Sequence, residues 1–226
     1  MLRDIDLAEV SDGKLYTNND MAKTDCGGCT GCSDCCRGMG SSIILDPYDV
    51  WRLCHGLSVS FEELLSAGRL ELNVVDGIIL PNLKMDSVTD SCTFLDENGR
   101  CSIHAYRTGI CRMFPLGRFY EDNSFKYFLQ VHECPKKNKS KVKIKKWLDT
   151  PDLKTYEQFI CDWHYFLKEL QLHAMQKTLE NPESDNTVKE LSMIVLKLFY
   201  MMPYSPEDFY KQFYRRLANA KKQTTI

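Results

Sequence analysis

Hydrophobic residues in the middle of the chain recur at spacings that predict short elements. Asp46 and Pro47 have the residue types of a helix N-cap and first helical position, and the apolar residues that follow predict a helix over 47–56. Ser60 and Glu63 have the spacing of a capping box, which predicts a second short helix. Both helices are expected before the first extended segments.

Turn-forming dipeptides predict extended structure in two places. Residues 71–85 are expected to form extended segments around Asp76-Gly77, which predicts a hairpin-type turn. Asn98-Gly99 predicts a tighter hairpin with Cys92 and Cys101 near its two arms. These two thiols are then expected to face one site.

The last third of the chain has the pattern of long amphipathic helices. Helices are predicted over 152–179, 187–201 and 205–220, with prolines at the breaks between them. Large apolar residues recur at helical spacing, which is more typical of a core or an interface than of a cofactor pocket. By contrast, residues 1–25 are polar and rich in turn formers, so we expect a loosely ordered arm there.

Composition and charge narrow the function classes. The chain has 226 residues, and 29 Lys and Arg nearly balance 31 Asp and Glu. The net charge of −2 gives no global reason to expect nucleic acid or an acidic membrane as a partner. No apolar run approaches the ~20 residues of a membrane span, and the acidic N-terminus lacks the features of a signal peptide. We therefore expect a cytoplasmic protein without a membrane span.

Cysteines are the main chemical feature of the sequence. There are eleven, and a reducing cytosol makes metal binding or redox chemistry a better explanation for such a set than disulfides. Repeated Cys-x-x-Cys steps let neighbouring thiolates converge on one metal ion. The sequence contains enough thiols for two four-coordinate sites. The candidate ligands are Cys26, Cys29, Cys32, Cys35, Cys36, Cys92, Cys101, Cys111 and Cys134.

The pair Cys35-Cys36 complicates this pattern. On an extended backbone the two side chains diverge, which indicates either that the stretch serves more than one centre or that one of the pair is not a ligand. Cys26 is the candidate whose role as a ligand is least defined by the spacing.

The metal is not determined by ligand type, because zinc and iron–sulfur clusters both accept four thiolates. Successive Cys-x-x-Cys steps followed by the remote Cys134-Pro135 resemble a ferredoxin, although Cys35 arrives one residue early and is followed by Cys36. The spacing therefore favours an iron–sulfur cluster of the [4Fe–4S] type, with Zn²⁺ as the alternative.

Other polar residues have simpler interpretations. His104 and His132 are reserve zinc ligands that are more often structural or solvated. Arg112 can donate hydrogen bonds to cluster sulfurs or to an anionic substrate, or form a surface ion pair. The lysine-rich segment 136–146 alternates with apolar residues and lacks stacking aromatics, so an edge strand with a solvated basic face is favoured over a nucleic-acid contact. Cys54 and Cys161 are expected to be structural.

Several cysteine segments resemble a known family. Cys29, Cys32, Cys35 and Cys36 match the Cys-x-x-Cys-x-x-Cys-Cys signature of the CxxCxxCC zinc- or iron-chelating family, which includes YkgJ-like proteins. The later segments that begin at Cys92, Cys101 and Cys111 match in order, so the resemblance covers about residues 26–135. Two departures, His104 and Arg107-Thr108 in place of Tyr and Arg-Pro, leave the ligands untouched.

This resemblance has an implication for function. Related clusters occur in flagellin lysine methylases, which look like iron–sulfur proteins, and this implies a link to methyl transfer onto a protein lysine. No phosphate-binding loop, nucleophile elbow or His-Glu-x-x-His motif is present, so no catalytic residue is assigned and the chain is not identified as an enzyme. If it is one, a lysine methyltransferase-like or redox component is expected.

Together these patterns predict an α+β protein with three parts. Residues 1–25 form an N-terminal arm, 26–148 a cysteine-rich loop and hairpin domain that binds metal, and 149–226 an all-α domain packed against it. The expected function is metal or cluster binding in support of redox chemistry or protein-lysine methyl transfer. The alternative is a structural zinc module whose helical tail binds an unidentified protein partner.

Overall fold

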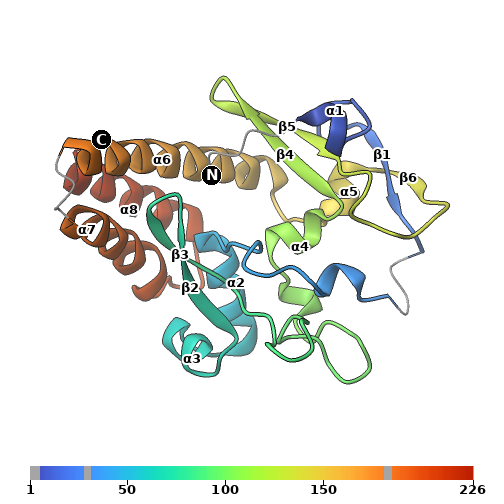
Figure 1. The fold of residues 1–226 in the computed structure, drawn as a ribbon, viewed down its shortest axis with the longest axis horizontal. Coiled ribbons are helices and arrows are strands. Elements are labelled where there is room, and N and C mark those ends of the chain that lie inside the picture. The colour runs from blue at the N-terminus through green and yellow to red at the C-terminus, as the bar shows by residue number, and fades with distance from the viewer. Residues whose placement is uncertain (1–5, 28–31, 181–184, 226) are drawn as a thin grey trace. The chain divides into compact units, whose positions relative to one another are not determined.

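A computed structural model describes residues 6–27, 32–180 and 185–225 (Figure 1). The chain forms two compact units. The helical unit comprises Ile44–Lys84 and the C-terminal residues from Asp162 onward, and the cysteine unit comprises the N-terminal segment through Ile43 together with Met85–Cys161. Helices and small antiparallel sheets confirm the α+β class. The functional division at residues 25 and 148 stays a prediction.

The first two helices of the helical unit begin at the predicted caps. Helix α2 (Pro47–Leu57) has the Asp46 side chain as N-cap, and α3 (Phe61–Ser66) has Ser60. In each case the third helical residue, Asp49 or Glu63, completes a capping box by accepting a bond from the cap backbone. Two backbone amides at each start, those of the cap and of the third helical residue, are thus satisfied locally, and both predicted helices are confirmed.

The predicted hairpin follows these helices. Strands β2 (Leu70–Val75) and β3 (Ile78–Leu83) pair antiparallel, and the turn residues Asp76 and Gly77 both have positive φ, as a tight hairpin of this type requires. The hairpin is attached to the C-terminal helices because the Ile79 amide donates to Ser192 Oγ at 3.0 Å.

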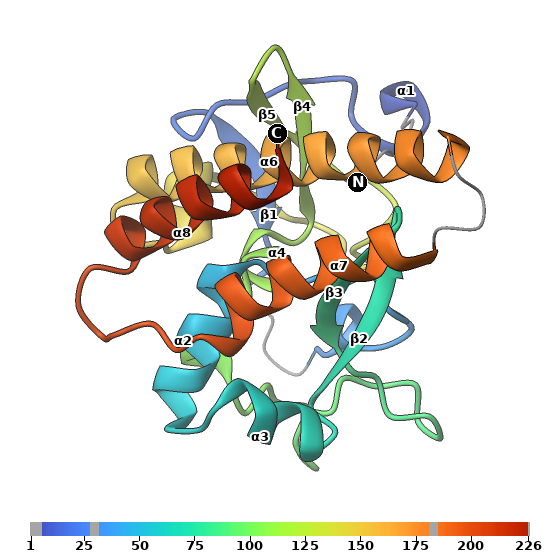
Figure 2. The ribbon, with the colours of Figure 1, turned by 90° about the vertical axis from the view of Figure 1, so that its left-hand side faces the viewer.

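Three long helices complete the helical unit. They are α6 (Leu153–Glu180), which begins in the cysteine unit, α7 (Asp185–Leu196) and α8 (Phe209–Thr224). Helix α7 continues as a π-helical segment, η3 (Lys197–Met201). Helices α6 and α8 lie side by side (Figure 2), and Tyr214 donates to Asp162 at 2.8 Å between them.

The aromatic residues of this tail form a core, as their spacing predicts. Trp163, Phe199 and Phe213 are buried with ring centroids 4.9–6.1 Å apart. The last helix begins later than predicted, at Phe209 rather than at residue 205. The cause is local: the Gln212 side chain accepts from the Ser205 amide and donates to the Glu207 carbonyl, which holds the preceding residues as a loop.

The cysteine unit is built from small two-stranded sheets. Strand β1 (Met21–Asp25) pairs with β6 (Ser140–Lys143), and β4 (Leu116–Glu121) pairs with β5 (Ser124–Leu129), both antiparallel. Short helices α1 (Leu7–Val10), α4 (Gly109–Met113) and α5 (Ile144–Leu148) and the 3₁₀ turns η1 (Asp34–Cys36) and η2 (His104–Tyr106) complete it. Its core cluster consists of Ala22, Met113, Leu116, Tyr127, Leu129, Ile144 and Leu148.

The N-terminal segment is better ordered than its composition predicts. Isolated bridges join Ser11 to Gln130 and Tyr16 to Tyr127, and Ala22 on β1 is 1% exposed. The expectation of a loosely ordered arm is therefore wrong for residues 6–25, because backbone pairing with distant strands supplies the order that local composition does not.

The predicted hairpin at Asn98-Gly99 is smaller than a pair of strands. Leu95 and Cys101 form an isolated bridge, closed by a bond from the Asp96 amide to the Arg100 carbonyl at 2.8 Å. Cys92 instead pairs with Met85, so the two thiols are not on the paired arms of one hairpin. The prediction of the turn is confirmed. Cys101 belongs to the bridge, and Cys92 lies beside the other arm, where its carbonyl accepts from the Leu95 amide at 2.8 Å.

Within the described residues, no helix combines the length and the apolar character that crossing a membrane requires.

Candidate metal centre

The first cysteines follow directly on a strand. Cys26 comes immediately after β1, and Gly27 has a φ of +79°, a conformation that favours glycine. The Asp25 side chain accepts from the Gly27 amide at 2.9 Å and so fixes the start of the loop. Cys29 lies outside the described residues, and the description resumes at Cys32.

Four candidate ligands line one small cavity in the cysteine unit. Cys26, Cys32, Cys35 and Cys134 surround a space of about 30 Å³, which we call the thiol pocket. Cys32 lies just before η1, Cys35 lies within it, and Cys134 comes from the loop after β5. The pocket thus joins the first cysteine cluster to the last candidate ligand, Cys134, which follows Cys35 by 99 residues. The remaining lining residues are Thr24, Asp34, Phe114, Pro115, Pro135, Lys136 and Trp147.

An apolar wall closes this pocket on one side. Trp147 belongs to α5, and its indole N–H donates to the carbonyls of Met113 at 3.3 Å and Phe114 at 3.0 Å. These bonds fix the ring beside Phe114 and Pro115. Trp147 could not be identified from the sequence, because its hydrogen-bond partners are carbonyl groups far away along the chain.

A second group of candidate ligands lies beyond η1. The Cys92 amide donates to the Cys36 carbonyl at 2.7 Å, and Arg37 bridges Ser91 next to it. Cys101 is close enough to Cys35 for their charges to interact, and Arg107 acts on both thiols. None of Cys36, Cys92 or Cys101 lines the thiol pocket, so Cys35 lies between the two groups.

Cys35 and Cys36 face one another rather than diverging. Their backbone is the 3₁₀ turn η1 and not an extended strand, so the geometric premise for their divergence is wrong. A hydrogen bond with the Cys36 thiol is the largest cause that raises the pKa of Cys35, followed by burial. Both side chains are therefore available to neighbouring sites.

Cys111 occupies a separate element. It lies on α4, where the Thr108 side chain is the N-cap and accepts from the Cys111 amide at 3.4 Å. Cys111 does not line the thiol pocket. Its place in the ligand set therefore stays a prediction that rests on spacing.

Two further thiols have raised pKa values. Burial raises the pKa of Cys101, and Arg107 offsets part of this effect. At Cys32, a backbone hydrogen bond lowers the pKa, but burial and the Asp34 carboxylate, which accepts from the thiol at 3.3 Å, outweigh it. These thiols are protonated at neutral pH, so a metal ion must displace their protons in order to bind.

The reserve ligands lie elsewhere. Burial is the largest cause that lowers the pKa of His104 in η2, with Arg107 and Arg100 acting in the same direction, and His132 is exposed. Neither histidine lines the thiol pocket. The basic strand predicted within 136–146 is confirmed for β6 (Ser140–Lys143), on which Lys141 and Lys143 are exposed, whereas the residues from Ile144 onward form α5.

Arg112 is buried, so a surface ion pair is the wrong interpretation of this residue. It is 4% exposed, its Nη1 donates to the Arg107 carbonyl at 2.9 Å, and its guanidinium carbon is 5.5 Å from the Tyr156 ring centroid. Within the described part of the chain, its Nε and Nη2 have no hydrogen-bond partner. Through Arg107, this side chain fixes the backbone that leads into α4.

The donor set fits a thiophilic metal by its chemistry, since four thiols converge on one enclosed space. Among the described residues, which exclude Cys29, no three His, Cys, Asp or Glu side chains are arranged closely enough to hold an ion. Binding by the pocket residues therefore requires the thiols to move toward a common centre.

Comparison with known proteins gives one match. The model of the CxxCxxCC family, described as "Putative zinc- or iron-chelating domain", matches residues 28–146, which is more than half of the chain. No curated protein and no solved structure gives a significant match.

Proposed function

The chain belongs to the CxxCxxCC family of metal-chelating domains, and from that premise we propose that the thiol pocket is its metal site and that an iron–sulfur cluster is the resident group. The observation that carries this proposal is the convergence of Cys26, Cys32, Cys35 and Cys134 on one cavity. These residues come from two segments that lie about a hundred residues apart in the sequence, so the approach of Cys134 to the first cluster is a property of the fold.

The surroundings of the pocket suit a negatively charged metal–thiolate group. Lys136 lines the pocket and supplies a positive charge next to the thiols. Phe114, Pro115 and Trp147 exclude water from one side, which strengthens the attraction between thiolate and metal. Cys29, by the family signature, is proposed as a further ligand from the adjoining loop.

Two observations favour different metals. The ferredoxin-like spacing supports a [4Fe–4S] cluster, which would supply one-electron chemistry when bound. The small volume of the pocket, about 30 Å³, supports a single zinc ion, because it has room for only a few water-sized groups. The cluster requires a larger rearrangement of the loop than the ion does. We rank the cluster first because of the cysteine spacing, and zinc is the second candidate.

The remaining cysteines give the proposal a second part. Cys36, Cys92 and Cys101 lie beside Cys35 and are proposed as a neighbouring thiol group, which holds a second metal or supports the first. Redox chemistry is the function that fits a cluster in this setting, and the methyl transfer implied by the family resemblance stays a prediction. With zinc, the site would be structural, and the helical tail would contact a protein partner.

Proton release tests whether thiols are the ligands. Each thiol that coordinates zinc loses its proton, so titration of zinc into the reduced, metal-free chain should release up to about four protons per ion at pH 6. The thiols with raised pKa values make affinity rise with pH, by about tenfold per pH unit for each proton released. Calorimetry in buffers of different ionisation enthalpy measures both quantities. Saturable binding without proton release, or no saturable binding, would contradict thiolate ligation.

A further inference from the structure

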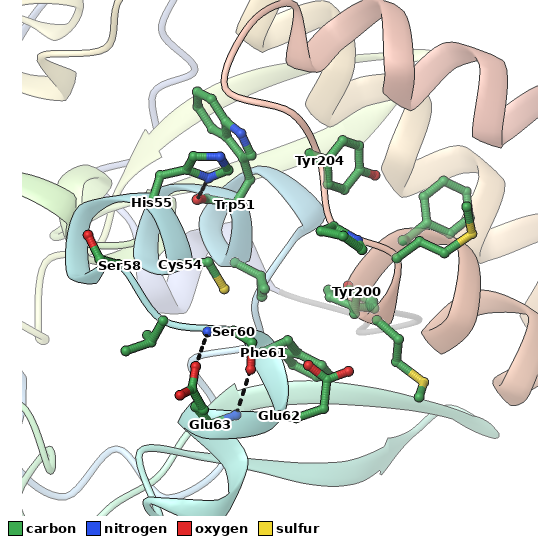
Figure 3. A pocket seen from close by; sticks show the side chains of 16 residues that line it. Trp51, Cys54, His55, Ser58, Ser60, Phe61, Glu62, Glu63, Tyr200 and Tyr204 are labelled. Atoms are coloured by element: carbon green, nitrogen blue, oxygen red, sulfur yellow. Dashed lines mark hydrogen bonds between the residues drawn. The ribbon is translucent and has the colours of Figure 1, made fainter.

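The helical unit contains a second, larger cavity that is separate from the cysteine cluster. It has a volume of about 460 Å³, within the usual range of ~300–1,000 Å³ for small-molecule sites. Figure 3 shows side chains from α2, from α3 and from the residues that follow α7 around it. We call it the aromatic pocket, after Trp51, Phe61, Tyr200 and Tyr204 in its walls.

The aromatic walls are held in place before any ligand arrives. The Tyr200 hydroxyl donates to the Leu45 carbonyl at 2.9 Å, and the Tyr200 ring lies 5.8 Å from that of Phe61. Trp51 stacks on Tyr48, with ring centroids 5.3 Å apart. A ligand therefore meets fixed ring faces, whose negative π-electron density attracts cations.

The charges around the pocket have one sign. Glu62 and Glu63 line it, and no Lys or Arg occurs among the described residues that do so. Helix α2 also ends there, and the carbonyl end of a helix carries partial negative charge. The pKa of the Cys54 thiol is raised to about 11, first by burial and then by the negative charges of Glu62 and Glu63.

One cation beside these walls, Arg216, already has its partners. Arg216 lies 3.6 Å from the Tyr204 ring centroid and donates to the carbonyls of Leu198, Met202 and Pro203 at 2.7–2.9 Å. It covers one face of Tyr204 and stabilises the end of the π-helical segment η3. Arg216 does not line the pocket, so its charge is directed at backbone carbonyls.

The backbone of one wall is unusual. Residues 199–201 of η3 line the pocket, and π-helical segments are rare insertions that occur often at functional sites. Here the segment presents Tyr200 and Met201 to the cavity, and Met201 and Met202 are 44% and 42% exposed at its edge. Flexible thioether side chains at the edge adapt to the shape of an apolar ligand.

We propose that the aromatic pocket binds a small organic cation, an alkylated ammonium compound held between aromatic faces and balanced by Glu62 and Glu63. The rings favour an apolar cation over a strongly hydrated inorganic one, because its alkyl groups contact the walls directly. The negative lining excludes anions of the same shape. This binding site is independent of the metal centre.

A pair of probes with the same shape tests the charge requirement. Choline and 3,3-dimethylbutan-1-ol differ in the replacement of nitrogen by carbon, and 3,3-dimethylbutanoate provides an anion of similar size. In the full chain labelled with ¹³C at the methionine methyl groups, choline should shift Met201 and Met202 in a saturable way. The alcohol should bind roughly three- to thirtyfold more weakly, the range expected for a cation–π contribution, and the anion should cause no shift at these methyl groups.

Glu62→Gln provides the matched variant. Glu62 is exposed on α3, so the fold should survive its loss of charge, and circular dichroism checks this. Choline affinity should fall about threefold or more, whereas the affinity for the alcohol should not change. Glu207→Gln removes an exposed carboxylate that does not line the pocket and should leave both unchanged. Equal binding of alcohol and choline, binding of the anion, or no choline shift at Met201 and Met202 would overturn the proposal.

Discussion

Replacing Cys32 and Cys134 together with serine is expected to remove nearly all of the metal that the thiol pocket holds. Both residues line this pocket, and in the sequence they lie on either side of β4 and β5. A four-thiolate site that loses two ligands keeps neither its charge nor its geometry, so metal in this pocket should fall to less than about a tenth of the unmodified level. Elemental analysis after anaerobic purification measures the loss.

The control removes the same number of thiols from other places. Cys54 lines the aromatic pocket, and Cys161 is buried on α6 with its thiol donating to the Asn123 carbonyl at 3.2 Å. The pair Cys54→Ser and Cys161→Ser should retain full metal content. Equal losses in the two double variants would mean that the effect comes from the fold, and full retention in both would place the ligands outside the thiol pocket.

Removal of the metal is expected to loosen the cysteine loops without unfolding the rest of the chain. The cysteine unit has its own apolar core, in which Leu116, Tyr127 and Ile144 are buried between strands and α5. The loops that carry Cys26–Cys36, Cys92–Cys111 and Cys134 contribute little to that core and depend on other links. Metal ligation therefore stabilises chiefly these loops.

Hydrogen exchange separates local from global effects of chelation. Structural zinc contributes ~10–16 kcal/mol to the folding of small zinc peptides, so a fraction of that value is enough to change loop protection by a hundredfold or more. Peptides from the three loops should exchange faster after chelation, whereas those from β4, β5 and α8 should not. A uniform increase over the whole chain, or no change in the loops, would contradict this view of the metal's role.

Helix caps and tight turns are the features of this fold that could be predicted from the sequence. Asp46 and Ser60 cap their helices because their side-chain oxygens bind the first free amides, and both partners lie within three residues. The same is true of the Asp76-Gly77 turn, where positive φ values limit the residue types. Such features depend on neighbours in the sequence, so pattern and spacing were sufficient.

Features that depend on distant partners could not be predicted in the same way. The N-terminal segment is ordered by pairing of β1 with β6, more than a hundred residues later, as in the register Ala22 to Val142. Arg112 is buried against Tyr156, which its own surroundings in the sequence do not indicate. The order of the N-terminal segment and the burial of Arg112 both depend on residues that come much later in the chain.

The candidate ligands illustrate the same distinction. The ferredoxin-like spacing already grouped Cys134 with the first cysteines, and these residues line one cavity, but the spacing did not indicate that Cys111 would lie on a separate helix away from that cavity. Lys136 and Trp147 complete the pocket through contacts that spacing does not encode. The identity of the metal depends on distances between thiolates, which residue types alone do not determine.

The most direct test of the central claim is anaerobic purification followed by visible absorption and analysis of iron, zinc and acid-labile sulfide. We expect metal bound to the chain: brown protein with iron and sulfide in comparable amounts for the cluster, or colourless protein with one or two zinc ions per chain for the alternative. Protein that contains neither iron nor zinc after this procedure would contradict the claim that the clustered thiols form a metal centre.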